Sequence, residues 1–152
     1  MTSNSIAPLP NLRDQRLASL FDYWKGKAGD RQMPAYRDID AVEMKTWLGN
    51  LVVVEFTDSL FNYRIRLEGT NIEQFYGDRR TGHGVEIVTS ADERDLLMRQ
   101  YRPVFEHGRP AYYEAAFENS YGIYSHQAKL LLPLSDDGHT VNMILAAIYF
   151  LR

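Results

Sequence analysis

Apolar and polar residues alternate from Phe61 to Leu67, and this period of two predicts a half-buried β-strand. The alternation stops at Gly69. Thr70 and Glu73 then have the spacing of a capping box, in which two side chains satisfy backbone groups at the start of a helix. Gly77 suits the left-handed residue that ends such a helix. We therefore predict a strand that leads directly into a short helix.

A second pattern, near the start of the chain, is helical. Its apolar residues recur at i, i+3, i+4 and i+7, namely Leu17, Leu20, Phe21 and Trp24. Because an isolated helix of this length is marginal in water, its apolar stripe must be covered. We expect burial against the outer face of a sheet or against a second subunit, so these four residues are the candidate dimer interface. Residues 1–10, small, polar and proline-containing, are expected to form a flexible tail.

Further strands and helices are predicted between and after these two segments. Asp40 and Glu43 form a second capping box, which predicts a short helix. The β-branched run Leu51–Phe56 predicts a buried strand, paired as a hairpin with the strand that ends at Leu67. A long helix is predicted to end at Gly108. The last third of the chain predicts three strands, over residues 111–118, 123–132 and 141–151.

Composition narrows the possible classes of protein. The 152 residues suit one domain, and 45% hydrophobic with 24% charged residues is ordinary for a globular protein. With a net charge of −3 and no basic patch, neither nucleic acid nor a membrane is an expected partner. No apolar run is long enough to span a bilayer and no signal peptide opens the chain, so we expect a cytoplasmic protein. The absence of cysteine excludes disulfides and cysteine–flavin adducts.

The predicted order of elements is that of an α+β fold, with a five-stranded antiparallel sheet and helices inserted between strands 2 and 3. Five short motifs accompany it: Tyr23-Trp24, Pro34–Asp40 (P-x-x-R-D-I-D), Tyr63–Thr70 (Y-x-x-x-L-x-G-T), Gly77 with Gly82, and Pro133–Gly138 (P-L-S-x-D-G). In order and spacing they resemble a PAS-domain family abundant in alphaproteobacteria. The resemblance implies a helical extension over residues 11–48, a PAS domain over residues 49–152, and a sensory or protein-interaction role without enzymatic activity.

The resemblance also implies a cupped sheet whose concave face can hold a small molecule. Rings, several of them with polar tips, are expected there, and the candidate ligand-binding residues are Tyr63, Phe75, Tyr101, Phe105, Tyr113 and His126. His126 is expected to point inward because Gln127 and Lys129 occupy the other face of its strand. The alternative is that these side chains form an ordinary, fully packed core. The sequence identifies neither a ligand nor a cofactor.

No pattern in the sequence is typical of a catalytic centre. The four histidines lack metal-ligand spacing, and Glu114 with Glu118 suits a solvated strand face better than an acid/base pair. The expected function is a non-enzymatic sensory module that binds a small molecule and signals through a protein partner or a homodimer. Two alternatives stay open: a small α+β cone enzyme of the ketosteroid-isomerase kind, and a purely structural dimerisation module.

Overall fold

The computed structural model describes residues 9, 12–57, 59, 62–77, 81–83, 91–119 and 121–151. The flexible tail predicted over residues 1–10 lies outside this range except for Leu9, as does the predicted strand start at Phe61. The elements are α1 (Gln15–Ala28), η1 (Tyr36–Asp38), η2 (Leu48–Asn50), β1 (Leu51–Phe56), β2 (Tyr63–Glu68), α2 (Thr70–Tyr76), α3 (Ala91–His107), β3 (Ala111–Glu118), β4 (Tyr124–Leu134) and β5 (Met143–Leu151). None of the described helices has the length and apolar character needed to cross a membrane.

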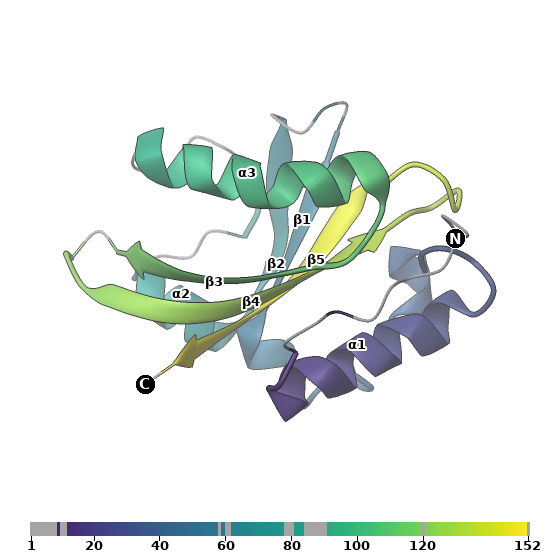
Figure 1. Cartoon of the computed structure of the whole chain (residues 1–152), viewed down its shortest axis with the longest axis horizontal. Helices are drawn as coiled ribbons and strands as arrows, with labels where there is room; N and C mark the ends of the chain where they lie inside the picture. The colour runs from purple at the N-terminus through teal and green to yellow at the C-terminus, as the bar shows by residue number, and fades with distance from the viewer. Residues whose placement is uncertain are drawn as a thin grey trace.

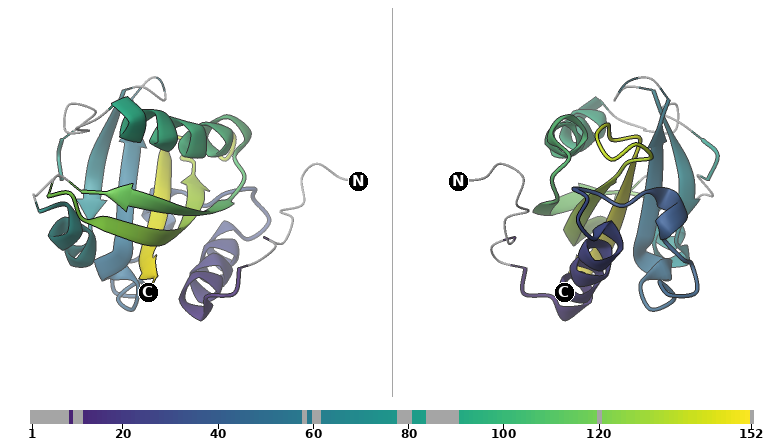
Figure 2. Two further views of the ribbon diagram at one scale, coloured as in Figure 1. Left: turned by 60° about the vertical axis from the view of Figure 1, so that its left-hand side comes forward. Right: turned by 90° about the vertical axis from the view of Figure 1, so that its right-hand side faces the viewer.

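The five strands form one antiparallel sheet in the order β2-β1-β5-β4-β3. Two strands precede α2 and α3 and three follow them, which confirms the predicted fold class. The sheet is strongly curved, with α3 lying across one face and α1 on the opposite face (Figures 1 and 2). We call the face under α3 the inner face and the face under α1 the outer face. Because both are covered, the central strands β1, β4 and β5 are buried over most of their length.

α1 covers the outer face with its apolar stripe. The four residues of the stripe are at most 5% exposed: Leu17, Leu20, Phe21 and Trp24. The indole N–H of Trp24 donates to the Pro133 carbonyl of β4 at 2.9 Å, and the Arg16 guanidinium lies over the ring of Tyr149 on β5. Of the two expected locations, the sheet is therefore the one observed. The four side chains belong to the core of a single chain and leave no surface for a second subunit, which corrects their assignment to a dimer interface.

The start of α2 also differs from the prediction. Gly69 is the N-cap residue, Thr70 is already helical, and no side chain caps this end. Gly69 is required by packing, because a Cβ placed there would lie 2.3 Å from the backbone of Gly49. The backbone N–H of Gly69 donates to the carbonyl of Leu51 at 2.8 Å, which holds the two segments together. The capping box predicted at Thr70 is therefore wrong, since a close approach of distant backbone segments determines this position.

The second predicted capping box forms only in part. The Asp40 carboxylate accepts from the backbone N–H of Val42 at 2.7 Å, as a cap should. Glu43 does not reach back to Asp40; its carboxylate accepts from the Tyr23 hydroxyl at 2.7 Å and pairs with Lys27 at 2.9 Å. Residues 41–47 form successive turns instead of a helix. This segment is held mainly by side chains of α1.

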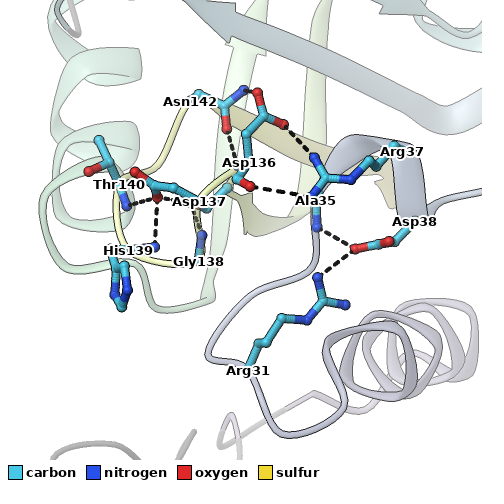
Figure 3. Close-up of polar contacts among 11 residues, drawn as sticks. Arg31, Ala35, Arg37, Asp38, Asp136, Asp137, Gly138, His139, Thr140 and Asn142 are labelled. Carbon is cyan, nitrogen blue, oxygen red and sulfur yellow. Dashed lines mark hydrogen bonds and ion pairs between the residues drawn. The ribbon is translucent and has the colours of Figure 1, made fainter.

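Two of the sequence motifs meet at one end of the sheet (Figure 3). In the first, the Asp38 carboxylate accepts from the backbone N–H of Ala35 at 2.8 Å and from Arg31 at 2.9 Å. Arg37 extends from this motif to the carboxylate of Asp136, at 3.8 Å, in the turn between β4 and β5. Within that turn, Asp137 accepts from the backbone N–H groups of residues 139 and 140, each at 2.8 Å. The contacts between the two motifs thus attach the segment after α1 to the hairpin of β4 and β5.

Candidate functional site

A cavity of about 50 Å³ lies between α3 and the inner face of the sheet. Most of its wall is aliphatic, from Val52, Val54, Ile65, Leu97, Met98 and Ile148. The other described lining residues have side chains with a polar end: Tyr63 on β2, Tyr76 on α2, Tyr101 on α3 and Lys129 on β4. Strand alternation sends every second residue of β1, β2, β4 and β5 to this face, which is why one recess collects residues distant in sequence. An apolar recess with a few polar tips is the composition of a small-molecule site.

The candidate residues are distributed unevenly around this cavity. Tyr63 and Tyr101 line it, as expected. Phe75 is not among the lining residues, because its ring packs against those of Tyr76 and Phe150 with centroids 5.0 and 5.3 Å away. Phe105 likewise packs edge-on against a ring of β1, that of Phe56, at 4.9 Å. Phe105 therefore packs against the core beside the recess, whereas Phe75 is a half-buried residue outside it.

Tyr113 is the half-buried neighbour of the cavity on β3. It pairs directly across the strands with Lys129, so both side chains emerge on the inner face. Burial raises the pKa of the Tyr113 phenol. Tyr113 is not among the residues that line the recess. Tyr113 therefore lies next to Lys129, just outside the cavity.

The prediction that His126 points into the cavity is wrong. Its side chain is 59% exposed on the outer face, where its ring lies 3.9 Å from the Glu114 carboxylate. Glu114 also accepts from the Tyr112 hydroxyl at 2.9 Å, so this strand face is the solvated surface that the sequence indicated. The error arose from the assumption that Gln127 and Lys129, as polar residues, face water. Both are in fact buried on the inner face.

Lys129 is the candidate site residue that sequence reasoning missed. It is 2% exposed, and its ammonium donates to the side-chain oxygen of Gln100 on α3 at 3.1 Å. The same nitrogen lies 4.4 Å from the centroid of the Phe117 ring, which adds a cation–π attraction. Removing an ammonium from water costs several kcal/mol unless partners compensate it. Gln100 and the Phe117 ring are among the contacts that compensate this cost, and the position of Lys129 in the cavity wall makes it a candidate site residue.

Gln127 adds a second unusual group on the same face. It lies two residues before Lys129, is 1% exposed, and neither amide atom has a hydrogen-bond partner. An amide buried in this way costs about 1–3 kcal/mol. The signal in the sequence was available in the other residues of β4: Ala128, Leu130 and Leu132 form an apolar set that suits burial under α1. Their alternation leaves the inner face to Gln127 and Lys129.

A second, larger hollow of about 550 Å³ lies at the surface beside the two joined motifs. It is polar, and its two arginines pair with carboxylates of the joined motifs: Arg31 with Asp38, and Arg37 with Asp136. We therefore regard this hollow as part of the structural contact between the motifs at residues 34–40 and 133–138. Among the described residues, no group of three or more His, Asp or Glu side chains is placed to hold a metal ion.

A sheet in this strand order, with helices inserted between β2 and β3 and closing a recess on its inner face, defines the PAS class of α+β domain. A family model described as a PAS domain matches residues 12–149. The chain therefore belongs to the PAS domain family. The cone-enzyme alternative is excluded by this connectivity. The match includes α1, and a domain boundary at residue 49 stays a prediction.

Solved structures show the same fold. A light-oxygen-voltage domain studied with a flavin analogue is 13% identical, with a TM-score of 0.57 over 73% of this chain and 83% of that one. The blue-light photoreceptor Aureochrome1 LOV, in its dark structure, is 11% identical, with a TM-score of 0.54 over 75% and 84%. The PAS domain of the fruit-fly ELK potassium channel is 13% identical, with a TM-score of 0.55 over 77% and 98%. No curated protein matches the chain.

Proposed function

We propose that this PAS domain is a non-enzymatic sensory module that holds a small molecule in the cavity beneath α3. The observation that carries the proposal is the buried ammonium of Lys129 in the wall of an otherwise largely aliphatic recess. A core selected only for stability would place an apolar residue there, because burying an ion pair or an ion is seldom better than packing hydrocarbon. A site that recognises a polar ligand needs such a group.

We expect a signal to pass from the cavity to α1 through strands β4 and β5, because both faces of these strands are covered. β4 and β5 carry the cavity wall on the inner face through Lys129 and Ile148, and they contact α1 on the outer face through Pro133 and Tyr149. A ligand that shifts either strand also shifts the surface on which α1 rests. A protein partner or a second copy of the chain would then read the changed position of α1, because any ligand effect requires differential contacts in the two states.

A flavin is not the ligand that this cavity supports. The similar light-oxygen-voltage domain was studied with a flavin analogue, whereas this chain has no cysteine to form an adduct. A cavity of about 50 Å³ also holds only about three to five water molecules, far less than three fused rings. We therefore propose a much smaller ligand.

Native mass spectrometry of the purified full chain tests the proposal. We expect a mass excess of a small molecule that disappears on denaturation, or that appears when candidate ligands are added. Lys129→Met should lose this excess while keeping the fold, and Lys45→Met, a change at an exposed lysine, should keep it. If no compound binds to the wild-type protein, the proposal of a small-molecule sensor is wrong, and a protein-interaction module is the function that remains.

Association without a ligand is the second candidate, and one surface feature favours it. Tyr121, Ile123 and Tyr124 are 68%, 58% and 70% exposed in and beside the turn between β3 and β4. Exposed apolar clusters of this kind often mark interaction sites. Replacing Ile123 and Tyr124 with serine should lower any self-association measured by analytical ultracentrifugation. Unchanged sedimentation would show that this turn is not the contact.

A further inference from the structure

We propose that the free edge of β3 binds an extended, basic segment of a partner protein, which adds to the sheet as a further strand. The free edge is the side of β3 that faces away from β4. This inference does not depend on the cavity beneath α3 or on its ligand. Three features lead to it: the backbone of β3, the protection of the opposite edge of the sheet, and the charge along β3.

β3 lies at the margin of the sheet and has one neighbour, β4 (Figure 2). The two strands pair in a continuous register, from Ala111 opposite Leu131 to Glu118 opposite Tyr124. Among the residues that the structure describes, no segment except β4 forms a hydrogen bond with the backbone of residues 111–118. Every second residue of an antiparallel edge strand directs its N–H and C=O groups away from its neighbour. β3 therefore presents a row of donors and acceptors to which another strand can bind.

The opposite edge of the sheet, formed by β2, is protected. The N–H of Ile65 donates to the carbonyl of His83 at 2.8 Å, and the N–H of Gly82 donates to the carbonyl of Ile65 at 2.7 Å. The pairing of β2 with β1 also contains a register shift, and β2 carries Arg64 and Arg66. Coverage by a neighbouring segment, irregular pairing and charged side chains are usual means of preventing strand addition.

β3 lacks most of this protection. It is 8 residues long, more than the typical length of about five to six, and it contains neither proline nor lysine. Its pairing with β4 has no register shift. Its two charged residues, Glu114 and Glu118, have the same sign. The contrast between the two edges indicates that β3 is open to a partner and that charge determines which partner it accepts.

The two carboxylates differ in how far they are engaged. Glu118 is exposed and has no partner among the described residues. The side chain of Glu114 is 50% exposed, and its oxygens accept from the Tyr112 hydroxyl at 2.9 Å and lie 3.9 Å from the His126 ring. A carboxylate offers about four acceptor sites, so Glu114 can accept further bonds. The cationic Arg109 lies before the start of β3, at the end remote from Glu118.

A basic strand fits this edge better than a second copy of the chain does. Pairing two β3 strands would gather the carboxylates of both copies on one face, and like charges across strands destabilise a sheet. A strand with lysine or arginine at alternate positions would instead place a cation opposite Glu114 and another opposite Glu118, since both point to the same face. The exposed side chains of Tyr121, Ile123 and Tyr124 continue this surface beyond Glu118. We therefore expect apolar residues next to the basic ones in the partner.

Isothermal titration calorimetry with matched peptides of about ten residues tests the inference on the full chain. The first peptide alternates lysine with valine, and the second alternates glutamate with valine. The third is the lysine peptide with methylated backbone nitrogens, which keeps the charge but removes the backbone donors. We expect the lysine peptide to bind at least about tenfold more tightly than either of the others. Amide hydrogen exchange in the complex should slow in β3 and stay unchanged in β2.

Reversing the charges on β3 adds a matched pair of variants. Glu114→Lys combined with Glu118→Lys should reverse the order, so that the glutamate peptide binds more tightly than the lysine peptide. Asp22→Lys combined with Asp30→Lys changes the net charge of the protein by the same amount, at exposed positions in and after α1. This control should keep the order of the wild-type protein.

Several outcomes would overturn the inference. If the methylated peptide binds as tightly as the unmethylated one, no backbone pairing occurs. If the variant at Glu114 and Glu118 keeps the preference for lysine, the peptide binds elsewhere. If no peptide binds, or if the wild-type chain sediments as a dimer whose β3 is already protected from exchange, a basic segment is not the partner of this edge. The comparison of peptides on the wild-type protein stands even if a variant fails to fold.

Discussion

Gly69 lies where two segments of the chain approach each other closely. Adding a methyl group there would place it 2.3 Å from the backbone of Gly49, and backbone cannot swing aside as a flexible side chain can. We therefore expect Gly69→Ala to destabilise the fold by about 2 kcal/mol or more. Thr70→Ala should cost less than the ~1 kcal/mol of a lost cap, because Thr70 caps nothing. Urea denaturation measures both, and equal midpoints for the two variants would contradict this assignment.

Asp137 makes the turn between β4 and β5 sensitive to acid. Backbone N–H groups of Thr140 and His139 and the hydroxyl of Ser135 lower its pKa to about 2. Because the folded pKa is depressed, the stabilising contribution is present above about pH 4 and is lost as the pH falls toward 2. Asp137→Asn should therefore lower the urea midpoint at pH 7 and flatten its decline between pH 4 and 2. Asp30→Asn is the control, because Asp30 is exposed and lines the same polar surface hollow as Asp137. An equal change in the urea midpoint for the two variants would contradict the prediction.

At the scale of elements, α1 is held to β4 by one buried hydrogen bond. Trp24→Phe keeps a ring in the core but leaves the Pro133 carbonyl without its donor. We expect a loss of about 1–3 kcal/mol in the free energy of unfolding. Trp47→Phe is the matched control, because that indole donates to Ser19 at an exposed position. If both variants lose the same free energy of unfolding in urea denaturation, the hydrogen bond from Trp24 is not what holds α1 to β4.

At the scale of the whole molecule, we expect ligand binding on the inner face of the sheet to change the dynamics of α1 on the outer face. With the cavity occupied by a small molecule identified by native mass spectrometry, we expect slower amide hydrogen exchange in β4, β5 and α1, because the same strands contact the cavity and the helix. Lys129→Met at the same concentration of that compound is the control. If protection stays confined to the cavity wall, α1 does not report on the ligand.

Much of this fold could be predicted from periodicity alone. Alternation located β2 and a β-branched run located β1. The stripe on α1 predicted its burial, and the order of elements predicted the sheet with its inserted helices. The motifs at residues 34–40 and 133–138 were visible as patterns. Their contact through Arg37 and Asp136 required the fold, because it joins residues 99 positions apart.

The candidate site was predicted less well, and β4 shows why. Its alternation separated His126 from Gln127 and Lys129 correctly, but a period of two does not say which set faces the core. α3 and α1 cover its two faces, so polarity could not identify the solvent side. The sequence by itself determined the elements, because hydrophobic spacing is local. Only the tertiary structure decided that Lys129 is inside, His126 outside and Gly69 against Gly49, because each depends on which distant segment packs there.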